Sequence, residues 1–166
     1  MLIIEDGTGN PHADSYSTAA ELVSYARMYG VTIPADEVAQ EALLRRSALA
    51  MNGMKWKGCR ANPDQALAWP RKDVIVDTEI KPSTYIPARI QYGQMALAAE
   101  IYTDDLDPVD SRRGAVTLER VEGAVTREYA AISSTSSRLL PAAPDRPSRS
   151  QFADYLLKRG LFAVRA

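Results

Sequence analysis

Few residues in this chain have the types and spacing that chemistry requires. His12 is the only histidine, and Asp14 follows it in a loop rich in Gly, Asn and Pro. A serine hydrolase would combine such a pair with a nucleophile elbow of the G-x-S-x-G type, and the sequence contains no such elbow. The string GTGNPH also departs from the G-x-G-x-x-G pattern of phosphate-binding turns at its last position. We therefore interpret His12 as a solvated loop residue and predict no catalytic residue, so the protein is not expected to be an enzyme.

The same loop has one further possibility, a calcium site. Asp6, Thr8 and Asn10 occupy alternate positions, as the ligands of a calcium loop do. Pro11 stands where such a loop needs glycine, and Ser17 stands where it needs glutamate. We therefore predict no metal and no cofactor, and expect a hydrogen-bonded Asx-type turn instead. A metal-dependent enzyme remains an alternative function, ranked third after the two functions given at the end of this section. Another acidic group lies in a polar stretch that we expect to be a solvated loop: Asp104, Asp105, Asp107 and Asp110.

The most distinctive stretch is KWKGCRANPDQALAWPRK, which spans residues 55–72. It contains both tryptophans, Trp56 and Trp69, and five of the twenty Lys and Arg residues against one acid. One hypothesis is a nucleic-acid surface, in which the two indole rings stack on bases and the cations meet phosphates. The cations concerned are Lys55, Lys57, Arg60, Arg71 and Lys72.

The other hypothesis for this stretch is a structural clamp. In a clamp the two indole rings cover the open end of a helical bundle, while Arg60 and Arg71 hold carbonyl oxygens or acids through their planar guanidinium groups. Pro70 restricts the backbone beside Trp69, so that this ring and Arg71 leave the chain in set directions. We favour the clamp. Its predicted residues are Trp56, Arg60, Trp69, Pro70 and Arg71.

The composition limits the class of protein. A chain of 166 residues suffices for one domain with a core. Its net charge of −1 gives the whole molecule no strong attraction to DNA or to a membrane surface. Cys59 is the only cysteine, which excludes an intrachain disulfide, and no apolar run is long enough to span a membrane. The first residues lack the features of a secretory signal, so we expect assembly in the cytoplasm.

Two helices are predicted before the tryptophan stretch. Thr18 and Glu21 form a capping box that begins the first helix, and Gly30 is suited to end it. The second helix is predicted over residues 34–51, with Gly53 after it. Its expected buried face is broad and apolar, with Leu43 and Leu44 at the flanks: Val38, Ala42 and Leu49, together with Arg45 or Arg46.

A third helix is predicted after that stretch, over residues 87–102. Gly93 lies within it and costs helix propensity, which indicates that another element approaches closely at this point. Within the stretch itself, one helical turn is expected at residues 64–68, because Asn62 precedes Pro63 in N-cap order. Residues 73–86 are expected to be irregular or weakly extended.

The last third of the chain differs in character. Alternating apolar residues on both sides of Gly123 predict a hairpin at about residues 115–130, which completes a core over residues 1–132. Residues 133–149 are rich in Ser and Pro and are predicted to be a linker. Residues 150–166 then form an apolar arm that must dock back or onto another chain. Its predicted docking residues are Phe152, Tyr155, Leu156, Leu161 and Phe162. The predicted fold is mainly α, a three- to four-helix bundle with a small β-hairpin and an extended C-terminal arm.

Several strings in the sequence resemble a tailed-phage protein family whose members carry the label of DnaT-like single-stranded DNA-binding proteins. These strings are EDGTGNPHADSY, STAAE, WKGCRANPDQALAWPR, IPARIQYGQMALA and VTREYA. The resemblance covers roughly residues 3–130 and, more loosely, the terminal helix. Its specific part is W-K-G-x-R followed by Q-A-L-A-W-P-R.

The resemblance implies a structural protein of the virion. Such proteins look like head-completion or head-to-tail adaptors, so the implied partners are a homo-oligomeric, dodecameric ring, the portal protein above it, and the next neck or tail protein below. Double-stranded DNA would pass through the lumen without sequence-specific binding, and no membrane is involved. The implied location is the neck of the virion, after assembly in the host cytoplasm. The alternative is a single-stranded DNA-binding accessory protein of replication, which the family label itself suggests.

Overall fold

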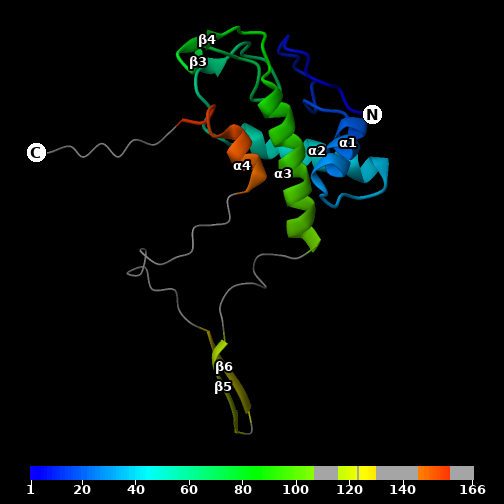
Figure 1. The fold of residues 1–166 in the computed structure, drawn as a ribbon, viewed down its shortest axis with the longest axis vertical. Helices are drawn as coiled ribbons and strands as arrows, with labels where there is room; N and C mark the ends of the chain where they lie inside the picture. The colour runs from blue at the N-terminus through cyan, green and yellow to red at the C-terminus, as the bar shows by residue number, and fades with distance from the viewer. Residues whose placement is uncertain (107–115, 123, 130–145, 158–166) are drawn as a thin grey trace, which may run out of the picture.

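The computed structural model describes residues 1–106, 116–122, 124–129 and 146–157. The described part is mainly helical, as predicted, and the helices pack together around the longest of them (Figure 1). The helices are α1 (Ala19–Tyr29), α2 (Glu37–Asn52), α3 (Ala88–Leu106) and α4 (Pro147–Phe152). The strands are β1 (Cys59–Arg60), β2 (Arg71–Lys72), β3 (Val74–Val76), β4 (Glu79–Lys81), β5 (Val116–Glu122) and β6 (Ala124–Tyr129), which pair in sequence order as three antiparallel ribbons.

Helix α3 is the central element of the fold. In Figure 1 α1 lies on one side of it and α4 on the other, while α2 crosses behind it. Two groups of buried side chains follow from this arrangement. Leu22, Leu44 and Met95 belong to the group between α1, α2 and α3. Trp69 and Phe152 belong to the other group, which joins the tryptophan stretch to α3 and α4.

The ends of α1 agree with the prediction from sequence. The Thr18 hydroxyl oxygen accepts a hydrogen bond from the backbone N–H of Glu21 at 3.2 Å, and the Glu21 carboxylate accepts one from the Thr18 N–H at 2.7 Å. This reciprocal pair satisfies two N–H groups that have no partner within the helix. Gly30 ends the helix with a φ of 65°, a left-handed conformation in which glycine carries no steric cost.

Helix α2 ends at Gly53 as predicted, but the prediction of its buried face is wrong. Val38 and Leu49 are each 72% exposed. The helix instead buries the face that bears Leu43, Leu44, Ser47, Ala48 and Met51. Apolar residues lie on both sides of this helix, so helical periodicity alone did not distinguish the side that meets α3 from the side that meets solvent.

The prediction that Gly93 permits a close approach is confirmed. A Cβ atom at this position would lie 2.1 Å from Cε1 of Phe152, far inside van der Waals contact. Gly93 therefore allows α4 to pack directly on the backbone of α3.

Helix α3 also continues beyond its predicted end at residue 102. Asp104 and Asp105, which we expected in a solvated loop, lie in its last turn. Arg146 binds the Asp104 carboxylate at 2.7 Å, and Arg46 binds the Asp105 carboxylate at 2.5 Å. These ion pairs offset the unfavourable placement of acids at a helix C-terminus. Two other acids of this group, Asp107 and Asp110, lie outside the described residues.

The ribbons divide into one that was predicted and two that were not. Pairing of β5 with β6 confirms the predicted hairpin around residue 123. The ribbon of β3 and β4 lies within residues 73–86, which were expected to be irregular or weakly extended, and it turns at Asp77 and Thr78 with φ values of 52° and 67°. Two positive φ values normally mark an Asn-Gly or Asp-Gly turn, so the Asp-Thr sequence did not reveal this one.

No helical turn forms at residues 64–68, contrary to the prediction. Asn62 does act as a local acceptor, since its side-chain oxygen lies 3.2 Å from the Asp64 N–H. The buried Gln65 side chain then donates to the carbonyl oxygens of Leu67 and Pro70 at 2.7 and 3.0 Å. These contacts hold the segment in an irregular path that local N-cap signals did not reveal.

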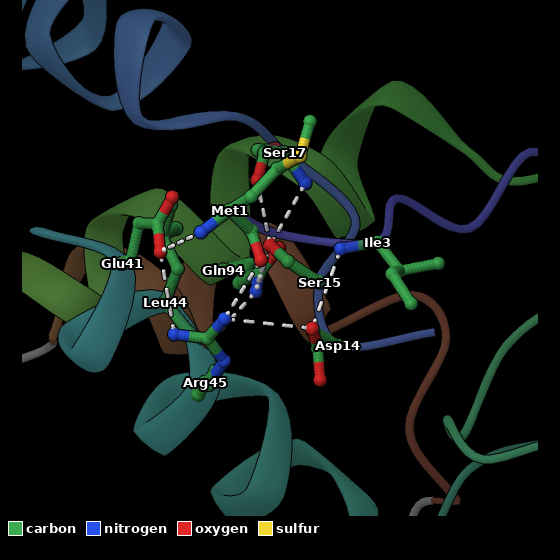
Figure 2. Close-up of polar contacts among 9 residues, drawn as sticks. All are labelled: Met1, Ile3, Asp14, Ser15, Ser17, Glu41, Leu44, Arg45 and Gln94. Carbon is green, nitrogen blue, oxygen red and sulfur yellow. Dashed lines mark hydrogen bonds and ion pairs between the residues drawn. The ribbon is translucent and has the colours of Figure 1, made fainter. Parts of the chain in front are cut away.

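A buried amide joins the N-terminal segment to the helices. Gln94 of α3 accepts a hydrogen bond from the Tyr16 N–H at 2.9 Å. Its Nε2 donates to the Ser15 hydroxyl oxygen at 2.9 Å and to the Leu44 carbonyl oxygen at 3.0 Å (Figure 2). The side chain of Gln94 therefore satisfies polar groups of two other elements in the interior. At the surface beside this network, Arg45 of α2 forms looser ion pairs with Asp14 and Glu41.

The C-terminal helix begins earlier than expected. Helix α4 starts at Pro147, within the segment predicted to be a linker. Ser148 is buried, and both its N–H and its hydroxyl bind the Glu100 carboxylate, at 2.9 and 2.7 Å. This contact with α3 holds the first turn of α4 in place. The Ser/Pro composition of the segment gave no indication of it, because the contact is made with a distant residue. Residues 133–145, which make up most of the predicted linker, lie outside the described residues.

Candidate nucleic-acid interface

The loop around His12 forms Asx turns, as expected. The Asp6 carboxylate accepts hydrogen bonds from the N–H and the hydroxyl of Thr8 at 3.1 and 2.7 Å, and these bonds lower the pKa of Asp6. The Asn10 side chain accepts one from the His12 N–H at 2.8 Å, and His12 itself is exposed. Across the described ranges no group of three His, Cys, Asp or Glu side chains is placed to hold a metal ion.

A buried carboxylate that sequence reasoning missed organises this loop from within. Glu5 is 2% exposed and accepts hydrogen bonds from the N–H groups of Gly7, Gly9 and Asn10 at 2.8–2.9 Å. A Cβ atom on Gly7 would lie 2.1 Å from the Thr84 carbonyl oxygen, so the loop packs tightly against the segment before α3. The string E-D-G-T-G-N, an acid just before two glycines, is the signal that could have indicated it.

Both tryptophans are buried in the interior. Trp56 is 4% exposed and Trp69 is 0% exposed, and their ring centroids lie 6.0 Å apart in a T-shaped arrangement. The Trp56 indole N–H donates to the Met51 carbonyl oxygen at 2.8 Å, at the end of α2. Buried rings offer no free face to a nucleobase, so the stacking proposed in the nucleic-acid hypothesis is wrong for these two residues.

The C-terminal segment covers the tryptophans. Phe152 packs edge-on against Trp56 at 5.1 Å, and Tyr155 packs edge-on against Trp69 at 5.5 Å. Two backbone hydrogen bonds of 2.9 Å also join the segments. The Lys57 N–H donates to the Tyr155 carbonyl oxygen, and the Leu157 N–H donates to the Lys55 carbonyl oxygen. Among the predicted docking residues, Phe152 and Tyr155 are buried in their own chain, Leu156 packs against the same core, and Leu161 and Phe162 lie outside the described residues.

Arg71 holds the stretch together through carbonyl oxygens. Its guanidinium donates to the carbonyls of Lys57 and Gly58 at 2.7 Å and of Ala68 at 3.1 Å. Partial burial lowers its pKa, although an arginine stays charged at neutral pH. Arg60 makes a longer contact of 3.3 Å with the Gln65 carbonyl, and it is exposed to solvent.

Pro70 and Tyr16 complete the surroundings of Trp69. Pro70 is buried and joined to Trp69 by a cis peptide bond, and its carbonyl accepts from the Ala61 N–H at 3.2 Å. The Tyr16 hydroxyl oxygen accepts from the Trp69 N–H at 2.9 Å, and burial raises the pKa of Tyr16. Tyr16 lies 53 positions away in sequence, so no local signal indicated this contact.

Among the remaining cations of the stretch, Lys55 and Lys72 are exposed and Lys57 is half-buried. Lys72 lies exposed on β2, directly opposite Cys59 of β1. Lys57 precedes the ribbon, and its ammonium reaches only a carbonyl oxygen, that of Ile75, at 3.4 Å. We call Lys57, Arg60 and Lys72 the basic ribbon, although Arg60 is paired with Arg71 and so lies on the opposite face of the β1–β2 pair from Lys72.

Comparison with known families decides the relationship. The family described as "Putative DnaT-like ssDNA binding protein" matches residues 1–165. The chain belongs to this DnaT-like family. No curated protein and no solved structure matches it. In the described part of this DnaT-like protein, no helix is both long enough and apolar enough to cross a membrane.

This finding overturns the identification as a phage head-to-tail adaptor. The family is described by single-stranded DNA binding, and no comparison supports a dodecameric ring, a portal or neck partner, or a place in the virion. The identification had rested on the resemblance, and the apolar arm was expected to dock back or onto another chain. Phe152 and Tyr155 of that arm pack on Trp56 and Trp69 of the same chain, so most of the described arm already has its partner.

Proposed function

We propose that this protein binds single-stranded DNA as a non-catalytic accessory factor of replication, acting in the cytoplasm where such strands are exposed. The observation that carries the proposal is the match of the DnaT-like single-stranded DNA-binding family to residues 1–165. The match extends over both core groups and the tryptophan stretch, so it supports a function of the domain as a whole.

The basic ribbon is the surface that we assign to the DNA strand. Its three cations lie within 16 positions of sequence. Arg60 and Lys72 are exposed and Lys57 is half-buried, whereas Arg71 is occupied by three carbonyl oxygens. With both tryptophans buried, contact would be made mainly with phosphates. Binding of that kind is tolerant of sequence and weakens steeply as salt rises.

We further propose that Trp56, Arg60, Trp69, Pro70 and Arg71 act as a structural clamp for this ribbon. The T-shaped packing of the two rings and the carbonyl contacts of Arg71 support this role. A rigid ribbon loses little conformational freedom when a flexible strand binds to it. The clamp and the DNA hypothesis are therefore compatible, with the rings inside and the lysines outside.

The test is equilibrium binding of a dye-labelled oligo-dT strand, followed by fluorescence anisotropy over a series of salt concentrations. Substituting Lys57→Gln and Lys72→Gln together should weaken binding and reduce the slope of log K against log salt by about 1.4, because each phosphate contact contributes about 0.7. Absence of any salt-dependent binding by the unmodified protein would refute the proposed function.

A matched control removes the same number of charges elsewhere. Arg27→Gln with Arg149→Gln takes two exposed cations from α1 and α4. This control should leave the slope unchanged within error. Equal loss of slope in both double variants would mean that the strand does not use the basic ribbon.

A further inference from the structure

A groove lies beside the basic ribbon but is separate from it. It opens between α3, α4 and the turn at residues 53–55, and its cavity volume is about 770 Å³. In Figure 1 this is the region where α4 lies against α3. The groove is large enough to receive two or three side chains of a bound peptide.

The floor of the groove is mainly aliphatic. Leu97 comes from α3, and Leu156 and Leu157 come from the segment after α4, where Leu157 is 56% exposed. The one aromatic residue, Phe152, is 1% exposed because it packs on Gly93 and Trp56. Strand-binding sites stack bases on exposed aromatic rings, so this floor suits apolar peptide side chains better than nucleobases.

The rim of the groove is positively charged. Lys55 and Arg149 are exposed, and neither forms an ion pair with another residue that the structure describes. Among the described lining residues the one acid is Glu100, which accepts hydrogen bonds from the Ser148 N–H and hydroxyl at 2.9 and 2.7 Å and lies 3.9 Å from Arg146. Two cations at the edge of an apolar floor are complementary to a ligand that carries carboxylates.

Charge also argues against the protein's own tail as the occupant. Residues 158–166 follow Leu157 directly and carry three cations, Lys158, Arg159 and Arg165, with no acidic side chain. Such a segment would be repelled by Lys55 and Arg149. A complementary occupant carries acidic side chains, which this segment lacks.

We propose that this groove docks an acidic, apolar peptide segment of a partner protein. Apolar side chains of the segment would rest on Leu97 and Leu157, and its carboxylates would pair with Lys55 and Arg149. The proposal does not depend on single-stranded DNA binding, since the groove uses none of the three cations of the basic ribbon.

The test is a selection from a displayed library of random short peptides against the full-length protein. The selected peptides should combine Asp or Glu with Leu, Ile or Phe. Synthetic copies should bind at least about tenfold more weakly to the K55E/R149E double variant, because both rim charges are reversed. Leu157→Asp should also weaken binding of these peptides, because it places a charge in the apolar floor of the groove. Thermal melting should show that each variant is folded.

The Lys57→Gln and Lys72→Gln double variant serves as the control and should bind the peptides as the unmodified protein does. Selection of basic peptides, selection of none, or equal binding to the K55E/R149E variant would each overturn the proposal. If oligo-dT displaces the peptides even from the Lys57→Gln and Lys72→Gln variant, that result would assign the groove to nucleic acid and would also overturn the proposal.

Discussion

At the scale of single residues, the two tryptophans have similar burial but different polar environments. Trp56 donates its indole N–H to the Met51 carbonyl at 2.8 Å. The indole N–H of Trp69 has no hydrogen-bond partner among the described residues. The two rings should therefore contribute to stability in different ways, and the clamp can be tested with this difference.

Trp69→Ala should destabilise the protein by about 3–5 kcal/mol, because it leaves a large cavity in the core. Trp69→Phe should cost clearly less, since no hydrogen bond is lost and part of the volume is kept. Trp56→Phe loses a hydrogen bond as well as volume and should cost about 1 kcal/mol more than Trp69→Phe. Urea denaturation measures all three, and a Trp69→Ala variant as stable as the unmodified protein would refute the clamp.

The buried Gln94 side chain offers a second test at this scale, because its hydrogen bonds can be removed by substitution. Gln94→Leu keeps much of the volume but leaves the buried Tyr16 N–H without a partner, whereas the Leu44 carbonyl keeps the Ser47 hydroxyl at 2.9 Å. An unsatisfied buried group costs about 1–3 kcal/mol, so we expect a loss in that range in urea denaturation. Gln91→Leu is the matched control, because Gln91 is half-buried and makes one 3.4 Å contact with Tyr16, and it should cost under about 1 kcal/mol.

At the scale of elements, the decisive contact is that of α4 with α3. Gly93 admits the Phe152 ring, Glu100 binds the first turn of α4, and the backbone of residues 155–157 pairs with residues 55–57. A six-residue helix is too short to be stable alone, so its position depends on these tertiary contacts.

Gly93→Ala tests this contact directly. Alanine gains about 1 kcal/mol of helix propensity, but its Cβ would overlap the Phe152 ring, so we expect a net loss of about 1–3 kcal/mol. Hydrogen exchange should show the loss first at the amides of Tyr155 and Leu157. Gly53→Ala, whose Cβ meets only the Ala50 carbonyl at 3.5 Å, should leave exchange in that segment unchanged. A Gly93→Ala variant in which these amides stay fully protected would contradict the role of Gly93.

At the scale of the whole molecule, charge is distributed unevenly. The total is −1, yet the stretch at residues 55–72 carries five cations and one acid. The fold places these cations differently: Arg71 binds carbonyl oxygens, Lys72 is exposed, Lys57 is half-buried, and Lys55 lines the groove. A global net charge near zero therefore does not argue against a local anion-binding surface.

This division predicts that the two surfaces can be separated by mutation. Lys57→Gln with Lys72→Gln should lose affinity for oligo-dT and keep peptide binding. The K55E/R149E variant should keep most of its affinity for oligo-dT and lose peptide binding. Both activities are measured on the same preparations by anisotropy, and parallel loss in both variants would show that the surfaces are one.

Local signals in the sequence determined the ends of α1 and the C-terminal end of α2. Thr18, Glu21 and Gly30 set the bounds of α1, and Gly53 marks the end of α2, because caps satisfy backbone groups within a few residues of the helix end. The β5–β6 hairpin was predictable from the alternation of apolar residues along neighbouring positions. The distinctive tryptophan strings also pointed to the DnaT-like family, although the virion role drawn from that resemblance was wrong.

Only the tertiary structure decided which surfaces these elements bury. The buried side of α2, the interior position of Trp56 and Trp69, and the docking of Phe152 and Tyr155 on them all depend on residues far apart in the chain. Hydrophobic burial has no direction along the sequence, so an apolar or aromatic side chain fits a core, a partner or a base equally well until its neighbours are placed. For that reason the sequence identified the important stretch, and the packing alone showed that its rings face inward while Lys55 and Lys72 are exposed.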